Sequence, residues 1–115
     1  MRRSGTLILC YHRVAEGVED PFYLCVRPDN FTAHLEELSR SREPSTLADV
    51  SAPSRRPRVV VTFDDGYRDN LTGALPIAES KGVPVTFFVT SGILGNHNGF
   101  WWDRLGPCCA RGHRT

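Results

Sequence analysis

The sequence predicts an α/β fold in which helices cover a sheet of parallel strands. Three short apolar runs alternate with segments whose apolar residues repeat at helical spacing. The order of strand, helix, strand, helix and strand is typical of parallel sheets, whose strands are apolar along their length because both faces are covered. A chain of 115 residues is long enough for one small domain.

The first strand is expected at residues 6–11, an apolar run too short to be a helix. A loop follows over residues 13–28. The first helix should start at Asp29 or Asn30, where a capping residue or a first-turn acid is favourable, and end before Pro44. Its apolar face consists of residues four and then three positions apart: Phe31, Leu35 and Leu38.

The second strand is expected at residues 58–63, after a connection rich in Pro, Ser and Arg. The helix after it should carry an apolar face between Leu71 and Ala78 and end at Gly82. Pro76 lies inside this helix, so it either kinks the helix or opens a new first turn.

The last part of the chain contains one more strand, expected at residues 84–90, and a helix that begins near Phe100. Residues 106–115 have no apolar period and are predicted to form an unstructured tail. Residues 1–105 are therefore assigned to a single α/β domain.

The composition excludes several classes of protein. The net charge is +1, which gives no strong field for nucleic acid or an anionic membrane. The arginines at positions 55, 56 and 58 are interpreted as part of a solvated loop. No apolar run is long enough to span a membrane, and the basic N-terminus is not followed by a signal-peptide core, so the chain as written is expected to be cytoplasmic.

The four cysteines are expected to be unpaired thiols in a reducing compartment. Cys10 lies in the first strand and is interpreted as a small core residue. Cys25 follows in the next loop. Cys108 and Cys109 are adjacent, which fits neither a CxxC metal knuckle nor a disulfide framework.

Polar residues stand at the end of each predicted strand. His12 follows the first, Asp64 and Asp65 follow the second, and residues 90–91 end the third. In open parallel sheets and in barrels, function gathers at the carboxyl ends of the strands. These residues are therefore expected to share one face of the molecule.

The two adjacent acids define the chemistry of this face. Neighbouring side chains on a regular strand point to opposite faces, so Asp64 and Asp65 can converge only if the strand stops and the chain turns. Gly66 provides the backbone freedom for that turn. Two like charges this close favour a compensating cation, so one acid could bind a metal while the other acts as a base.

Two families with acidic strand ends fit this pattern less well. Phosphatases of the haloacid dehalogenase type carry Asp-x-Asp-Gly-Thr, whereas Asp64 and Asp65 are adjacent and Tyr67 replaces the threonine. Receiver domains of two-component signalling carry their magnesium-binding acids on the first strand and a phospho-accepting Asp after the third. Here the acids end the second strand, and the third strand ends in Val89 and Thr90.

Residues 62–67, Thr-Phe-Asp-Asp-Gly-Tyr, resemble the first motif of the polysaccharide deacetylases, the NodB homology domain of carbohydrate esterase family four. Three further segments resemble parts of bacterial members in the same order, namely residues 9–14, 82–89 and 100–103. The resemblance implies a fold that is the N-terminal portion of a distorted (β/α) barrel with parallel strands.

The resemblance also implies roles for individual residues. Asp64 would be the general base, and Asp65 would bind a divalent metal, zinc or else cobalt or nickel, that holds water against an N-acetyl carbonyl. His12 and Tyr67 are weaker candidates for substrate binding or for support of the site. The substrate would be an N-acetylated polysaccharide or oligosaccharide, and the products would be acetate and a free amine.

Two features depart from the family pattern. The family's remaining metal ligands are two histidines in a His-Ser/Thr-x-x-x-His motif, and no pair among His12, His34, His97 and His113 has that spacing. The sequence also ends before a barrel can close, so a truncated or frame-shifted product is expected. A non-catalytic carbohydrate-binding module and a magnesium-binding phosphotransfer domain remain alternatives.

Overall fold

The computed structural model describes residues 5–111, with side chains up to Cys108. Its main sheet has four strands, all parallel. The strands are β1 (Thr6–Tyr11), β4 (Glu43–Pro44), β5 (Arg58–Phe63) and β6 (Val85–Phe87). The helices are α1 (Pro28–Ser41), α2 (Leu75–Ser80) and α3 (Trp101–Arg111).

Strand β5 is the centre of this sheet. It pairs with β1 along the whole length of both strands, from Thr6 opposite Arg58 to Tyr11 opposite Phe63. Its other edge is shared by β4 and then β6, because the carbonyls of Val59 and Phe63 accept hydrogen bonds from Ser45 and Phe88 on that side. Every residue of β5 is buried, as its continuous apolar sequence predicts.

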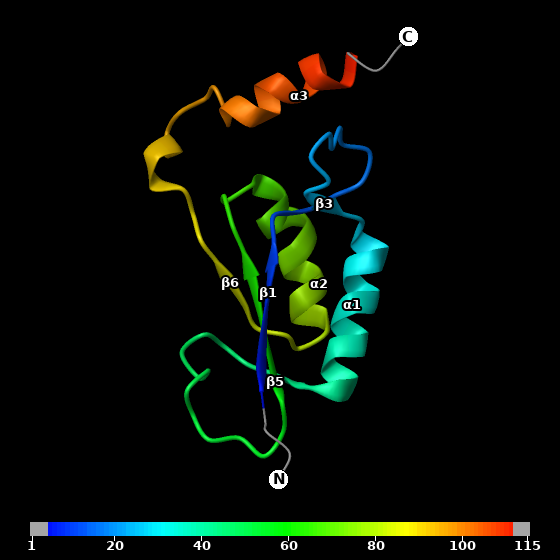
Figure 1. Ribbon diagram of the computed structural model, residues 1–115, viewed down its shortest axis with the longest axis vertical. Coiled ribbons are helices and arrows are strands. Elements are labelled where there is room, and N and C mark those ends of the chain that lie inside the picture. The colour runs from blue at the N-terminus through cyan, green and yellow to red at the C-terminus, as the bar shows by residue number, and fades with distance from the viewer. Residues whose placement is uncertain (1–4, 112–115) are drawn as a thin grey trace.

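Helices α1 and α2 cover one face of the sheet (Figure 1). The predicted apolar stripe of α1 points inward, where Phe31 and Leu35 pack in one cluster with Val61 and Phe63 of β5. All four side chains are at most 1% exposed. Burial of this stripe, rather than a capping side chain, stabilises α1, since the residue before it, Arg27, makes no cap hydrogen bond.

The helix after β5 combines two geometries. It begins as a π-helical turn, η1 (Asn70–Ala74), in which Leu75 donates its N–H to the Asn70 carbonyl, and it continues as α2. Pro76 lies in the first turn of α2, so the second of its two predicted effects is the one observed. The wider turn accommodates a residue that has no N–H and would clash with a regular preceding turn.

The end of α2 is confirmed at Gly82, which has a φ of 65°. The N–H of Gly82 donates to the Glu79 carbonyl, and the N–H of Val83 donates to the Ala78 carbonyl. This pair of bonds is a Schellman motif, and glycine suits it because the position requires a left-handed backbone. The chain then turns directly into β6.

The predicted loop over residues 13–28 contains regular structure that its sequence did not reveal. Strands β2 (Arg13–Val14) and β3 (Cys25–Val26) form a two-residue parallel pair. The carboxylate of Asp20 accepts hydrogen bonds from the N–H groups of Leu24 and Cys25, which fixes the return of the loop. Strands this short carry no periodic pattern, so the sequence could not predict them.

The prediction of an unstructured tail is wrong for residues 106–111, which continue α3 to Arg111. Residues 112–115 lie outside the described part of the chain. Helix α3 lies across the end of the molecule at which β1 and β5 finish (Figure 1). Gly106 packs against Pro21, where an added Cβ would come within 2.8 Å of the proline ring. A small residue at this position therefore lets α3 approach the loop.

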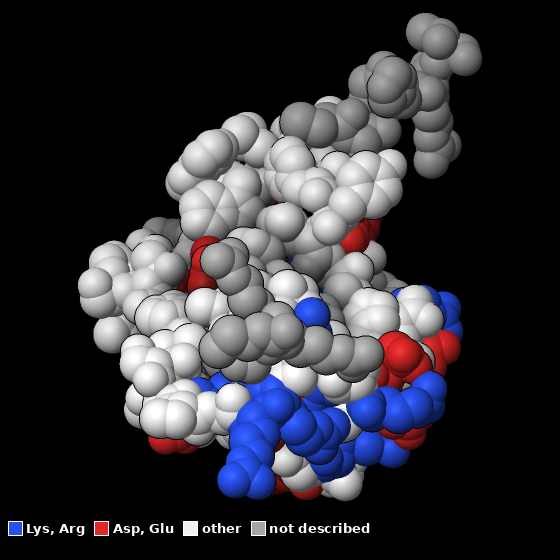
Figure 2. All heavy atoms as spheres, turned by 60° about the horizontal axis from the view of Figure 1, so that its bottom comes forward, with Lys and Arg blue, Asp and Glu red and all other residues white. Residues whose placement is uncertain are grey.

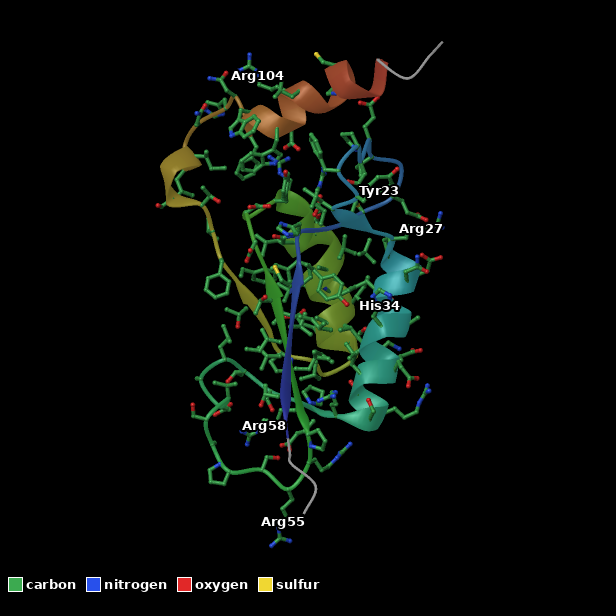
Figure 3. The ribbon with its side chains drawn as sticks, in the orientation of Figure 1. Tyr23, Arg27, His34, Arg55, Arg58 and Arg104 are labelled. Carbon is green, nitrogen blue, oxygen red and sulfur yellow. The ribbon has the colours of Figure 1, made fainter. Side chains whose placement is uncertain are left out.

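Positive charge gathers at the opposite end of the molecule (Figure 2). Arg55 and Arg58 both lie there, while Arg104 lies on α3 at the other end (Figure 3). Arg55 and Arg56 are exposed, as expected. Arg58 is not solvated: it is 8% exposed, and its guanidinium donates to the carbonyls of Asp49, Ala52 and Pro53. These hydrogen bonds hold the connection before β5 in place.

The sheet does not close into a barrel within residues 5–111. Large apolar side chains on β1 and just after β6 remain about half exposed: Ile8, Phe88 and Val89. Of the helices that the structure describes, none has the length and hydropathy required to cross a bilayer. The architecture confirms the expected α/β fold with an incomplete set of parallel strands.

Candidate active site at the acidic turn

The two adjacent acids lie where β5 ends and the chain turns. Asp64 still follows the strand, since its N–H donates to the Tyr11 carbonyl at 3.0 Å. Asp65 and Gly66 then adopt φ values of 75° and 78°. Asp is one of the few residues with a side chain that visits this left-handed region readily. At Gly66 a Cβ would also lie 3.1 Å from Val89 Cγ1, so this position favours glycine twice over.

The turn places Asp65 against His12. Nδ1 of His12 lies 2.8 Å from Oδ2 of Asp65, and both side chains are partly buried. The backbone of His12 is held as well, because its carbonyl accepts a hydrogen bond of 2.9 Å from Nδ2 of Asn70. Asn70 is only 2% exposed, so the bond is shielded from water and fixes the end of β1 relative to η1.

Asp64 lies close to Cys10 and to His12. One ligand atom each from Cys10, His12 and Asp64 lies within 4.8 Å of the other two. The predicted convergence of His12, Asp64 and Asp65 on one face is therefore confirmed as geometry. Cys10 was misassigned, because its side chain is exposed rather than buried in the core. The missed signal is spacing: Cys10 is two residues before His12, which directly follows β1.

The groups around Cys10 change the pKa of its thiol. Partial burial raises the pKa of Cys10, and a hydrogen bond and repulsion from Asp64 raise it further. Of the four cysteines expected to be unpaired, Cys10, Cys25 and Cys108 are free thiols, and the side chain of Cys109 lies outside the described residues. In the absence of a cation, the neighbouring carboxylates thus favour the protonated thiol.

Tyr67 joins the turn to α3 rather than to the acids. Its hydroxyl donates to Oδ1 of Asp103 at 3.0 Å and accepts from Nε1 of Trp102 at 2.8 Å. The guanidinium of Arg13 lies 4.5 Å from the centre of its ring. Burial, more than the hydrogen bond to Asp103, raises the pKa of Tyr67 to about 12. These contacts give Tyr67 a structural part in positioning α3.

Two hollows adjoin the acids and share Asp65. One, of about 450 Å³, is lined by Asp64, Asp65, Phe88, Val89 and Thr90. The other, of about 440 Å³, has an almost wholly apolar lining: His12, Phe22, Leu24, Asp65, Trp101, Trp102 and Leu105. The carboxylates therefore lie between a hollow of mixed polarity at the end of β6 and an apolar wall formed by α3 and residues 22–24. A ring with one polar and one apolar side fits such a surface.

The donor atoms at this site suit a divalent metal. Zinc in proteins is bound by thiolate, imidazole and carboxylate, and a catalytic zinc usually has three protein ligands. The group of Cys10, His12 and Asp64 provides one donor of each kind. His34 and His97 lie on the surface elsewhere, and His113 is outside the described residues. Asp65, the ligand implied by the resemblance, is bonded to His12 and could reach a metal directly or orient that ring.

Comparison with known proteins identifies the family. Residues 51–115 match the family model described as polysaccharide deacetylase, which is more than half of the chain. The chain belongs to the polysaccharide deacetylase family. A curated relative is YxkH of Bacillus subtilis (strain 168), named a putative polysaccharide deacetylase, which is 29% identical over 96 residues. That alignment covers 77% of this chain and 33% of the relative.

Solved structures of similar fold agree with this assignment. IcaB from Ammonifex degensii superimposes with a TM-score of 0.69 at 24% identity, over 95% of this chain and 50% of that one. The Streptococcus pyogenes deacetylase PplD, determined in complex with acetate, gives a TM-score of 0.65 at 25% identity, over 81% of this chain and 46% of that one. The chain thus spans about half the length of these structures, as expected for the N-terminal portion of a deacetylase barrel.

Proposed function

We propose that this chain, residues 1–105 above all, forms the N-terminal part of a metal-dependent deacetylase that hydrolyses the N-acetyl groups of an amino-sugar polymer. The observation that carries the proposal is the placement of two adjacent carboxylates beyond the end of β5, with His12 bonded to Asp65. Family membership supplies the class of reaction.

In this proposal the two acids have different parts. Asp64 takes a proton from the attacking water, and Asp65 binds the cation. Bound there, zinc, or else cobalt or nickel, would supply Lewis-acid polarisation of the acetyl carbonyl. His12 fixes the carboxylate of Asp65, and the Asn70 bond to the His12 backbone keeps that arrangement rigid.

The surface around the acids supports the substrate class that family membership implies. The apolar hollow beside Asp65 is lined by Trp101 and Trp102, and an aromatic wall next to polar groups suits the two-sided surface of a sugar ring. Positive charge gathers at the end of the molecule away from the acids (Figure 2). We therefore propose an N-acetylated polysaccharide or oligosaccharide.

We expect the remaining metal ligands of such an enzyme to come from the part of the domain that these residues do not supply. The isolated chain of 115 residues should then release no acetate from N-acetylglucosamine oligomers, even with added zinc or cobalt. Robust acetate release that is lost in Asp64→Asn would show instead that this chain holds a complete catalytic site.

A chimera tests the assigned roles directly. Residues 1–105 would replace the matching segment of YxkH, and acetate release would be measured with zinc, cobalt and nickel. We expect activity in the chimera, a loss of at least 100-fold in Asp64→Asn and Asp65→Asn, and no change in Glu37→Gln, an exposed acid on α1. An active Asp64→Asn chimera would overturn the assignment of the base.

One alternative has an observation in its favour. Trp101 is 66% exposed beside the apolar hollow, which a non-catalytic carbohydrate-binding module could use. Binding of N-acetylglucosamine oligomers by a chimera that releases no acetate would support that function. The phosphotransfer alternative loses support from the family assignment, and labelling of Asp64 or Asp65 by acetyl phosphate would be needed to restore it.

A further inference from the structure

We propose that this chain has a thiolate-containing metal site, formed by Cys10, His12 and Asp64, which takes a thiophilic divalent cation such as zinc, cadmium or cobalt. The ligand atoms of the three residues lie within 4.8 Å of one another. This site differs from the one assigned to the deacetylase reaction, because its donors include a sulfur atom and the other acid, Asp64. It does not depend on acetyl hydrolysis.

The backbone holds these donors in place. Cys10 lies on β1, and His12 is the first residue after that strand, two positions further along the chain. The β1–β5 register pairs Cys10 with Thr62 and Tyr11 with Phe63, which puts Asp64 opposite His12. The hydrogen bond from Asp64 N–H to the Tyr11 carbonyl fixes this register at the last step. Cys10 thus lies on a paired strand, and His12 and Asp64 each directly follow the last paired residue of a strand.

The outer contacts of His12 match those of a metal-bound histidine. Nδ1 lies 2.8 Å from Asp65 Oδ2, which leaves Nε2 as the nitrogen able to bind a cation. Histidines that bind metals usually donate their other N–H to a carboxylate or a carbonyl, and this fixes the ring and raises its basicity. Asp65 fills that place here.

The charge and chemistry of the cluster favour a soft cation over magnesium. Two carboxylates and a thiol lie together, and the nearby Arg13 is bonded to Asp69 instead. Thiolate selects zinc and related metals, whereas magnesium prefers oxygen alone. Bond lengths of about 2.0–2.3 Å in a tetrahedral site bring ligand atoms to roughly 3.3–3.8 Å from each other, so side-chain shifts of about 1 Å close the site.

Occupation of this site would remove Asp64 from any role as a base. The two arrangements are therefore alternative uses of the same carboxylate. A thiophilic cation on Cys10 should inhibit acetyl hydrolysis, while a cation bound through Asp65 should support it.

Cobalt titration of the reduced full chain tests the site, because a cobalt–thiolate bond gives a charge-transfer band in the near ultraviolet. We expect the band to saturate at one equivalent and to be lost in Cys10→Ser. It should persist in the triple variant Cys25→Ser, Cys108→Ser and Cys109→Ser, which keeps Cys10 alone. Asp64→Asn should weaken cobalt affinity by at least 10-fold.

Several outcomes would overturn the proposal. The first is a charge-transfer band that survives in Cys10→Ser. The second is loss of the band in the triple variant although the circular dichroism of that variant matches the parent. The third is a cobalt spectrum of the parent without a thiolate band. The metal site and the proposed function can fail separately. Cobalt–thiolate binding by the full chain without acetate release by the chimera contradicts only the proposed function. Acetate release by the chimera together with no thiolate band in the full chain contradicts only the metal site.

Discussion

Nδ1 of His12 lies 2.8 Å from Oδ2 of Asp65, although the two residues are 53 positions apart in the sequence. The contact joins the ends of β1 and β5. His12 is the first residue after β1, and Asp65 is the second residue after β5. Because Asp65 has a left-handed backbone and Gly66 follows in the same conformation, the carboxylate can turn back toward β1. The chemistry of the face depends on this contact.

Replacement of His12 should reduce metal binding. In His12→Ala the chain loses one donor, and Asp65 loses its partner. We expect the cobalt or zinc affinity of the chain to fall by 10- to 100-fold, measured by competition with a chromophoric chelator. The matched control is His34→Ala, an exposed histidine bonded to the Tyr11 hydroxyl. Equal effects of the two substitutions would contradict the assignment.

Gly73→Ala should destabilise the fold even though alanine favours helices. A Cβ at this position would lie 2.5 Å from the Val14 carbonyl oxygen, so η1 or β2 would have to move. We expect a loss of about 1–3 kcal/mol in urea unfolding, against an intrinsic helix gain of about 1 kcal/mol. Gly92→Ala is the control, because nothing lies within 4 Å of a Cβ there; it should change stability by about 0.5 kcal/mol or less. Unchanged stability of Gly73→Ala would show that η1 can shift freely.

The ion pair of Arg13 and Asp69 should contribute more than the surface pairs. Nη2 of Arg13 lies 2.8 Å from Asp69 Oδ2, and the other carboxylate oxygen accepts the Val14 N–H. The two side chains are 21% and 14% exposed, so Asp69→Ala leaves a partly buried cation and an N–H group without partners. We expect a loss of about 1–3 kcal/mol in urea unfolding.

The control for this pair is the exposed contact between Glu37 and Arg40 on α1, whose side chains are 68% and 72% exposed. Glu37→Ala should cost about 0.5 kcal/mol or less, because water and salt screen exposed pairs. Similar losses for Asp69→Ala and Glu37→Ala would mean that burial does not distinguish the two pairs.

Tyr67 should make stability depend on alkaline pH. Its pKa is raised to about 12, chiefly by burial, from an unfolded value of about 10. A raised folded pKa means that the folded state favours the neutral phenol, so this stabilisation is complete below about pH 10 and declines as the pH rises toward 12. The free energy of unfolding, measured in urea between pH 9 and 12, should fall less steeply with pH for Tyr67→Phe than for the parent. The exposed Tyr23 provides the control, because Tyr23→Phe should leave the pH dependence unchanged.

The sequence predicted the elements that are long or strongly patterned. The apolar runs of β1 and β5 and the stripe of α1 could be read because burial on a sheet or one helix face imposes a period. The glycine after α2 was predictable because the left-handed turn there restricts the residue type. Convergence of His12 with the acids followed from parallel strand order alone.

Other features depend on contacts that no local pattern contains. Strands β2 and β3 form by pairing across a loop, and Arg58 is buried because carbonyls five to nine residues earlier in the chain accept its hydrogen bonds. Cys10 has an apolar neighbourhood in sequence but an exposed side chain, since no strand of the described sheet covers its face of β1. Residues 106–111 are helical despite weak patterning and a proline at 107.

The pairing of β1 with β5 has a consequence for synthesis of the chain. Strand β1 leaves the ribosome early, but its partner in the sheet ends at Phe63, some fifty residues later. At about 5–20 residues per second, the nascent chain carries an unpaired apolar strand for roughly 3–10 s. During that interval β1 has both edges open to chaperones or to neighbouring nascent chains. The speed of translation through residues 12–63 should therefore influence how much of this protein reaches its native sheet.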